Sequence, residues 1–200
     1  MIGKLNKIIK DLYKECKERG LYYFFIMYFS NFLALFRAFF YKSIYFRNIT
    51  GAAFFLGKRS RFDIFNKKSK INIDKYVYIR KNATIRVDFQ CNLSIGEKVF
   101  INDNCNINCV RKISIGNLTK IGQNVCIYDH DHNYKKNGSN RLNIGEVIIG
   151  KNVWIGSNTV ILRNTRIGDN AVIAAGSVVK GEIPENSVFY NKKNNEIFQY

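Results

Sequence analysis

The sequence predicts an all-β solenoid over its last two thirds, preceded by a helical segment. Three observations predict it: an aliphatic side chain returns at every sixth position, a small residue follows many of these positions, and no helical spacing accounts for them. An α-helix places apolar residues three and four apart, and a half-buried strand places them two apart. A period of six therefore indicates short strands joined by tight corners, each with one aliphatic side chain in a narrow core. The longest run is Ile149, Ile155, Ile161, Ile167, Ile173 and Val179.

The same period occurs in three shorter runs upstream, and its phase slips by four and then two residues between them. Small insertions at the corners explain the slips. The runs are Ile73–Cys91, Ile95–Ile113 and Ile115–Ile127. We expect the residue after each aliphatic one to turn the corner with a positive φ, which glycine and asparagine tolerate. These residues are Gly96, Asn102, Asn108, Gly116 and Gly122.

Neighbouring coils of a solenoid bury one another's surfaces, so the repeats are expected to form one domain. We place this domain at residues 71–188. A basic, aromatic helical segment at 1–70 precedes it, a loop excursion at 128–148 interrupts it, and a short tail at 189–200 follows it. The chain has 200 residues, of which 46% are hydrophobic and only one is proline, so a packed core is expected rather than disorder.

The front segment carries much of the net charge of +17, with 15 Lys and Arg against four acidic residues in positions 1–70. Residues 1–20 are expected to form an amphipathic helix, and an uncharged aromatic run of 16 residues follows at 21–36, shorter than the roughly 20 that span a bilayer. Two interpretations of residues 1–50 stay open: peripheral contact with an anionic membrane surface, or helices that pack on the solenoid or between subunits. Nucleic-acid binding is not favoured, because no recognised motif accompanies the charge.

Five cysteines without disulfide-type spacing, and a start that lacks the apolar stretch of a secretory signal, indicate reduced thiols and a cytoplasmic location. This location includes the inner face of the cytoplasmic membrane, if residues 1–50 contact it.

The excursion at 128–148 contains both histidines of the chain, His130 and His132. Excursions from a rigid scaffold often carry function. As metal ligands these histidines would join Asp129 and Asp131, but no third histidine or patterned cysteine completes a tetrahedral site, so no metal is expected. As a solvated loop they would have no role. As a general base, a neutral imidazole suits pH 7.

The repeat Ile-Gly-x-x-small-x, together with the segments IYDHDHNY and IIGKNVWIGSNTVI, resembles the hexapeptide-repeat acyltransferases over roughly residues 70–188. Within that family the segments are most similar to sugar and polysaccharide O-acetyltransferases of the galactoside and maltose type. The resemblance implies a left-handed parallel β-helix, a homotrimer with active sites between subunits, acetyl-CoA as co-substrate and a saccharide acceptor.

The resemblance also implies roles for individual residues. His130 lies 24 residues before Trp154, as the family's catalytic base does, and His132 is the second choice. Asn102 matches an asparagine that contacts acceptor hydroxyls, although it is equally well explained as a plain corner residue. Asp129 and Asp103 are candidates to orient the imidazole. Direct transfer is expected, because no cysteine or serine adjoins the histidines in the sequence.

Coenzyme contacts are expected along one edge of the solenoid, where small residues let the pantetheine arm approach the backbone. The candidates are Trp154, Ser157, Ala175, Gly176, Ser177 and Lys180. The sequence departs from the family after Lys180 and at its end, where Lys192 and Lys193 are alternative phosphate ligands.

The resemblance implies O-acetylation of a bacterial surface saccharide, such as capsule, O-antigen or exopolysaccharide, or of its precursor. Two alternatives remain open at this point: N-acetylation of a nucleotide-linked amino sugar, and a solenoid that binds without catalysis. The acceptor sugar itself is not encoded in any pattern that a single chain displays.

Overall fold

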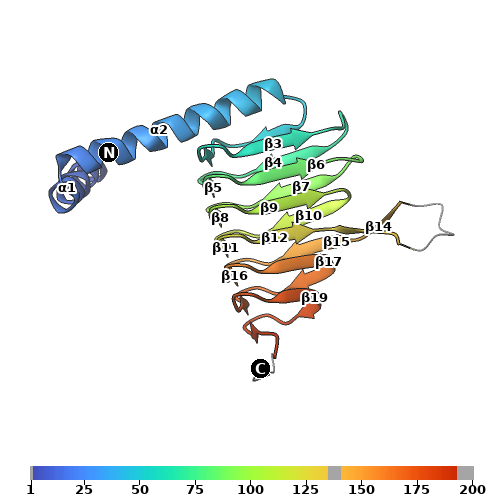
Figure 1. Cartoon of the computed structure of the whole chain (residues 1–200). Helices are drawn as coiled ribbons and strands as arrows, with labels where there is room; N and C mark the ends of the chain where they lie inside the picture. Colours follow the sequence, from blue (N-terminus) through green and yellow to red (C-terminus); the bar gives the residue numbers. More distant parts are fainter. Residues whose placement is uncertain (1, 135–140, 193–200) are drawn as a thin grey trace, which may run out of the picture.

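The computed structural model describes residues 2–134 and 141–192. They form two N-terminal helices and a solenoid of parallel strands with six complete coils and part of a seventh (Figure 1). Each complete coil crosses three faces, which we call A, B and C in the order in which the chain meets them. The predicted parallel solenoid is confirmed.

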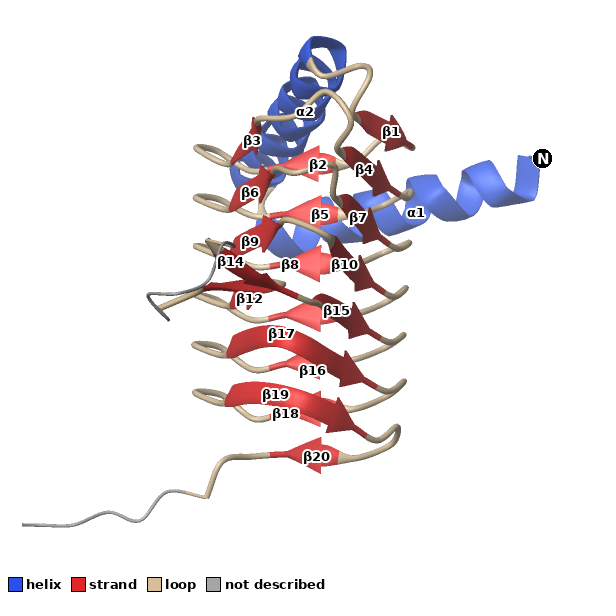
Figure 2. Ribbon diagram, turned by 90° about the vertical axis from the view of Figure 1, so that its right-hand side faces the viewer, coloured by secondary structure: helices blue, strands red, loops and turns tan. Residues whose placement is uncertain are grey.

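Each face is a stack of short strands, one from each coil (Figure 2). Face A contains β1 (Ile49–Gly51), β4 (Lys70–Ile73), β7 (Asn92–Ile95), β10 (Lys112–Ile115) and β15 (Glu146–Ile149). Face B contains β2 (Phe55–Leu56), β5 (Tyr78–Ile79), β8 (Phe100–Ile101), β11 (Lys120–Ile121), β16 (Trp154–Ile155), β18 (Val172–Ile173) and β20 (Val188–Phe189). Face C contains β3 (Arg61–Ile64), β6 (Thr84–Val87), β9 (Asn106–Cys109) and β12 (Cys126–Tyr128). Two longer strands, β17 (Val160–Ile167) and β19 (Val178–Ile183), turn from face C into face A.

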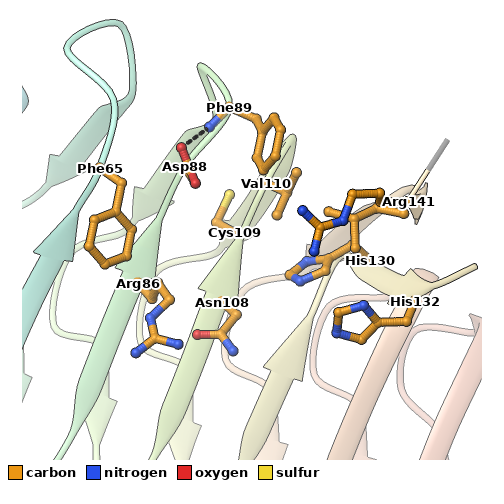
Figure 3. A pocket seen from close by; sticks show the side chains of 11 residues that line it. Phe65, Arg86, Asp88, Phe89, Asn108, Cys109, Val110, His130, His132 and Arg141 are labelled. Carbon is orange, nitrogen blue, oxygen red and sulfur yellow. Dashed lines mark hydrogen bonds between the residues drawn. The ribbon is translucent and has the colours of Figure 1, made fainter.

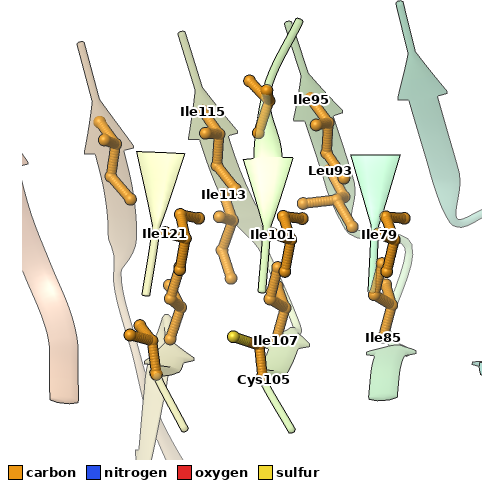
Figure 4. Close-up of a cluster of buried hydrophobic side chains, with 14 of the residues drawn as sticks. Ile79, Ile85, Leu93, Ile95, Ile101, Cys105, Ile107, Ile113, Ile115 and Ile121 are labelled. Carbon is orange, nitrogen blue, oxygen red and sulfur yellow. The ribbon is translucent and has the colours of Figure 1, made fainter. Parts of the chain in front are cut away.

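The six-residue period becomes three columns of aliphatic side chains inside the solenoid (Figure 4). On face A, Ile95 pairs with Ile73 in the coil before and with Ile115 in the coil after. Ile101 and Ile107 occupy the matching places on faces B and C, and all five of these side chains are at most 2% exposed. The period thus predicted both the strands and which side chain of each faces inward.

The corners differ from the expectation in one respect. None of the five residues expected to take a positive φ has one. In four of the five cases the positive φ falls two positions later, at Lys98, Asn104, Leu118 and Asn124. The glycines after the aliphatic residues are required for space instead. A Cβ at Gly116 would lie 2.5 Å from the backbone carbon of Gly150 in the next coil. Close stacking of coils, rather than backbone strain, therefore explains these glycines.

The coil length varies along the solenoid, and most of the variation lies at the edge where face C meets face A. A coil is 22 residues long from Ile49 to its partner Ile71, but 18 from Val147 to its partner Thr165. The extra residues lie between face C and face A, at 65–69, 88–91 and 110–111 in the first three of the coils. We call this the histidine edge, because residues 129–145 belong to it in the fourth coil. These insertions account for the phase slips in the sequence.

The solenoid begins earlier than residue 71. Strands β1, β2 and β3 form a first coil within the segment expected to be helical, and β1 pairs in parallel with β4. The periodic signal is hidden there because Phe54 and Phe62, rather than isoleucines, fill the core, each at most 2% exposed. Upstream, α1 (Ile2–Arg19) and α2 (Leu21–Ile44) form the helical part. α2 lies across the end of the solenoid (Figure 1), with Ala34 and Ala38 buried.

Candidate active site

A two-stranded hairpin leaves the solenoid at the histidine edge. Its strands, β13 (His130–His132) and β14 (Leu142–Ile144), pair antiparallel, so His130 faces Ile144 and His132 faces Leu142. The base of the hairpin is closed by a hydrogen bond from the Gly145 N–H to the Asp129 carbonyl, at 2.7 Å. The scaffold therefore positions His130 directly beside the fourth coil. The hairpin tip, at 135–140, lies outside the described residues.

Asp129 is fully buried and accepts hydrogen bonds from the preceding corner. The backbone N–H groups of Val110, Arg111 and Lys112 donate to its carboxylate at 2.7–2.9 Å. Burial by itself would raise the pKa of Asp129, but the hydrogen bond from His130 and those from the backbone lower it below the ordinary value. Asp129 is therefore an anion at neutral pH.

His130 contacts this anion through Nδ1, which lies 2.9 Å from Oδ1 of Asp129. A carboxylate only accepts hydrogen bonds, so Nδ1 donates to Asp129, and Nε2 is the ring nitrogen left for a reactant. The His130 side chain is 19% exposed, enough for a reactant to reach it. Of the two carboxylates considered, Asp129 holds the imidazole. Asp103 instead pairs with Arg80 and Lys81 at another edge.

Both histidines line a pocket of about 430 Å³ that follows the histidine edge (Figure 3). Its wall combines apolar and charged side chains from successive coils, in a size range suited to a small ligand. The lining residues are Phe65, Arg86, Asp88, Phe89, Asn108, Cys109, Val110, His130, His132, Arg141 and Leu142. The sequence directed attention to the histidines only. Phe65 and Phe89 are each about 60% exposed. The sequence offered one signal for them, because both are aromatic residues within the insertions that lengthen the coils.

Cys109 lies in the same pocket, although it is distant from His130 in the sequence. It is 1% exposed, and its hydrogen bond with Cys91 together with its burial raises the pKa of the Cys109 thiol far above the ordinary value. A thiol that does not ionise is a poor nucleophile. Cys109 is thus a core residue and not a nucleophile. Direct transfer of the acetyl group to the acceptor, without an acyl-enzyme, stays a prediction.

Asp131 points away from the histidines and pairs with Arg163 of β17. The carboxylate of Asp129 is occupied by His130 and the backbone. Within the described ranges, no group of three or more His, Cys, Asp or Glu side chains converges as metal ligands do. His132 is exposed at the rim of the pocket, with no part in the Asp129–His130 pair.

The other predicted residues mostly lie at a different edge, where face B meets face C. We call this the serine edge; it comprises residues 102–105, 122–125, 156–159 and 174–177 of four successive coils. Asn102, Ser157 and Ala175 belong to it, and Ser157 Oγ accepts a hydrogen bond from the Gln123 N–H at 3.2 Å. An asparagine ladder runs along this edge from Asn124 to Asn158 at 2.9 Å. Face C separates the serine edge from His130 within one chain.

Trp154 is 60% exposed on face B next to the serine edge, between Lys120 and Val172 of the neighbouring coils. Ala175 is exposed and Gly176 half-buried, so the edge presents backbone with little side chain. Ser177 differs from the expectation: it is 2% exposed, because its side chain points into the core as the small residue of its repeat. Its side chain is therefore turned away from the edge surface, and its place in the coenzyme site stays a prediction.

Lys180 lies in β19, where this strand turns from face C into face A. It is thus at the histidine edge and not beside Ala175 and Gly176, as the family pattern implied. The reason is that Val178 and Val179, which belong to face C, lie between Gly176 and Lys180. Of the alternative phosphate ligands, Lys192 is exposed and Lys193 lies outside the described residues.

Comparison with known proteins is consistent with this architecture. Residues 146–181 match the family described as bacterial transferase hexapeptide (six repeats). The putative lipopolysaccharide biosynthesis O-acetyl transferase WbbJ of Escherichia coli K12 is 36% identical over 103 residues, covering 46% of this chain and 53% of WbbJ. Galactoside O-acetyltransferase of the same organism is 32% identical over 130 residues, covering 61% and 63%. The chain thus spans between half and two thirds of the length of these relatives.

Among solved structures, a point mutant of AntD, an N-acyltransferase from Bacillus cereus in complex with dTDP and coenzyme A, has a TM-score of 0.58 at 19% identity, covering 74% of this chain and 80% of that one. At this identity the likeness concerns the fold. The solenoid is accordingly a left-handed parallel β-helix, and residues 146–181 carry the repeat of the bacterial transferase hexapeptide family.

Proposed function

We propose that the protein is an acetyl-CoA-dependent O-acetyltransferase that acts on a hydroxyl of a bacterial surface saccharide or its precursor. The observation that carries the proposal is the Asp129–His130 pair, at 2.9 Å, in the wall of a pocket of about 430 Å³. The relatives named as O-acetyl transferases support acyl transfer to oxygen. Exposed Phe65 and Phe89 rings supply flat apolar surfaces for a sugar ring, and Arg86 and Arg141 supply hydrogen-bond donors for its oxygens.

The chemistry assigned to His130 follows from its hydrogen bonds. A sugar hydroxyl is a weak nucleophile, and it attacks faster when a base removes its proton during the attack. Nε2 of His130 accepts that proton, while Asp129 stabilises the resulting imidazolium. The imidazolium then donates the proton to the departing sulfur, which restores the neutral base. Acetyl-CoA, when bound, supplies the acetyl group as a thioester.

The serine edge fits the coenzyme arm. Ala175 and Gly176 leave the backbone uncovered, and the Trp154 ring stands exposed beside them. In this proposal the backbone N–H of Ser157 meets the charge that develops on the carbonyl oxygen. Asn102 lies on the same edge, three coils before Ala175. In this proposal it contacts hydroxyls of an acceptor bound beside His130 of a neighbouring copy, and not of an acceptor bound beside His130 of its own chain.

One copy of the chain does not bring the two halves of this site together. Ser157 and His130 lie at opposite edges of face C, and about six residues of extended strand span about 20 Å. The coenzyme edge of one subunit therefore has to meet the histidine edge of another. A head-to-tail interface closes into a ring when its rotation allows, and we propose the homotrimer that the family resemblance implies.

Replacing His130 by Ala tests the base. We expect kcat to fall by about 10²–10⁴-fold, the usual contribution of a general base, with the fold unchanged because the side chain is at a pocket wall. The measurement is release of free thiol from acetyl-CoA in the presence of candidate glycans. His132→Ala is the matched control and is expected to retain most activity. A fully active His130→Ala enzyme would contradict the assignment.

Product chemistry separates the alternatives. Mass spectrometry of the glycan after incubation should show one added acetyl group, and hydroxylamine should remove it, because it cleaves esters and leaves amides intact. A resistant acetyl group would identify N-acetylation instead. A chain that binds glycan but transfers nothing with any acceptor tested would identify a binding module.

A further inference from the structure

α2 exposes an unusual amount of aromatic surface. Six aromatic residues recur at alternating spacings of three and four, which places them along one side of the helix. All six are between 61% and 70% exposed: Tyr22, Phe25, Phe29, Phe32, Phe36 and Phe39. We call this the aromatic stripe. Contiguous apolar surface of this extent is rare on a soluble monomer and marks an interaction site.

The aromatic stripe faces away from the solenoid. The opposite side of the same helix carries Ala34 and Ala38, each 3% exposed, which pack onto the first coil. The contact is reinforced by Arg37 Nε, which donates to the Leu56 carbonyl at 2.9 Å, and by Lys42 Nζ, which donates to the Gly51 carbonyl at 2.5 Å. The helix is thus fixed as a platform across the end of the solenoid (Figure 1). The exposure of the stripe residues shows that the stripe faces outward from this platform.

α1 adds positive charge beside the stripe. Four lysines, Lys7, Lys10, Lys14 and Lys17, are exposed along it. On the same helix Leu5, Ile8, Ile9 and Tyr13 are also more than half exposed. The two helices are joined by a hydrogen bond from the Tyr28 hydroxyl to Glu15 at 3.1 Å. Aromatic surface flanked by lysines matches the interface of a bilayer with anionic headgroups.

We propose that α1 and α2 bind the surface of an anionic lipid membrane and lie in its plane. By length and composition alone α2 is also suited to cross a membrane. Its contacts argue against crossing, because the part from Ala34 onward is docked on the solenoid. The 13 residues before it extend only about 20 Å, short of the roughly 30 Å hydrocarbon core.

A second copy of the chain is the competing occupant of this surface. Coiled-coil seams are narrow and favour Leu, Ile and Val over aromatic residues. Here the apolar surface is wider than a seam, since Tyr23, Ile26 and Phe40 outside the stripe are also 48–67% exposed. The exposed lysines of two copies would also repel each other. Lipid, which covers a broad apolar surface and neutralises lysines, fits both features.

This inference does not depend on the transferase activity, but it bears on the acceptor. The pocket begins at Phe65 in the first coil, under α2, and reaches His130 in the fourth. Coils are about 4.8 Å apart, so His130 lies roughly 15 Å from the coil that α2 covers. An acceptor held at a membrane surface would be within reach of the pocket.

Vesicle co-sedimentation of the full chain tests the proposal, with phosphatidylcholine vesicles that do or do not contain phosphatidylglycerol. We expect binding at least about tenfold tighter to the anionic vesicles, and weakening of about fivefold for each of Lys10 and Lys14 replaced by Gln. The triple variant F29E/F32E/F36E should lose binding. The control V188E/Y190E changes residues that are equally exposed at the opposite end of the solenoid and should bind like the unaltered protein.

Light scattering of the same variants decides between lipid and a second copy. All of these side chains are exposed, so the variants are expected to keep the circular dichroism spectrum and subunit number of the unaltered protein. The proposal is overturned if the unaltered protein ignores both kinds of vesicle, or if the triple glutamate variant still sediments. It is likewise overturned if that variant loses subunits, which would show that another copy covers the stripe.

Discussion

Asp129 links the architecture of the solenoid to its chemistry. The same carboxylate that orients His130 also receives the N–H groups of Val110, Arg111 and Lys112, which turn the preceding corner. A buried carboxylate is stable only when such donors compensate its lost hydration. The corner therefore holds in place the carboxylate that orients the imidazole of His130.

Asp129→Asn is expected to lower stability by about 1–3 kcal/mol at pH 7, because an amide NH₂ would face backbone N–H groups that then lack an acceptor. The lowered pKa of Asp129 means that its contribution is complete above the ordinary carboxyl value of 3.8 and is lost as the pH falls through the lower value in the folded state. Urea unfolding of both proteins at pH 7 and in steps toward pH 3 measures this. The difference in free energy of unfolding between the two proteins should narrow only below about pH 4. A difference that already narrows near neutrality would contradict the assignment.

The two histidines show how far residue-level reasoning extends. Their shared position in the only long interruption of the repeat was enough to nominate both. The choice of His130 came from its distance to Trp154 and stays a prediction. The structure adds the physical distinction: His130 contacts a buried carboxylate, whereas His132 is exposed at the rim.

At the scale of the repeat, a glycine that follows a core aliphatic residue lets the coils stack closely. Strands stack at about 4.8 Å, and at Gly116 and Gly122 this leaves no room for a side chain, since an added Cβ would lie within 2.5–2.7 Å of the next coil. The left-handed positions are filled separately, most often by asparagines, several of whose side chains hydrogen-bond to one another along the edges. Where both residues occur in one corner, glycine provides the space and asparagine the conformation.

Gly116→Ala is therefore expected to destabilise the protein by about 1–3 kcal/mol through steric overlap with the next coil. Thermal or urea unfolding measures the effect. Gly3→Ala in α1 is the matched control, because nothing lies within 4 Å of its Cβ position, and it should be neutral or slightly stabilising. Equal free energies of unfolding for Gly116→Ala and the unaltered protein would contradict this prediction, because the coils would then move apart without any loss of stability.

The histidine edge is also an element-scale device. Its insertions occur in the coils that build the pocket, and they contribute Phe65, Asp88 and Phe89 to its wall. Beyond Ile167 the coils are shorter and this edge carries no insertion. One edge of a regular solenoid is thus modified to form a pocket while the core columns continue unchanged.

For the whole molecule, the central feature is the separation of the two proposed half-sites on opposite edges of face C. If each subunit supplies its histidine edge to one neighbour and its serine edge to the other, two inactive variants can restore activity together. His130→Ala disables the first edge. Ala175→Trp places a bulky side chain on the second, where Ala175 is exposed.

Each variant alone is expected to be inactive. Co-purified trimers that contain both variants should regain about a third of the activity per site, because one of their three interfaces combines two intact edges. Thiol release by doubly tagged oligomers measures this. A mixture of His130→Ala with His130→Asn is the control, since both variants affect the same edge and cannot complement. Absence of recovery in the first mixture would place both half-sites on one chain.

The sequence by itself determined the repeat, the inward-facing side chains and the place where the repeat is interrupted, because a core one side chain wide requires an aliphatic residue at a strict period. It did not reveal the first coil, where Phe54 and Phe62 replace the isoleucines, nor the burial of Ser177. Only the tertiary structure decided which coils lie side by side at each edge. It thereby joined Asp129 to a corner 17–19 residues earlier, brought Phe65 and His130 into one pocket, and turned the aromatic stripe of α2 outward. These are contacts between coils, which depend on the lengths of the insertions at one edge, and no local pattern encodes them.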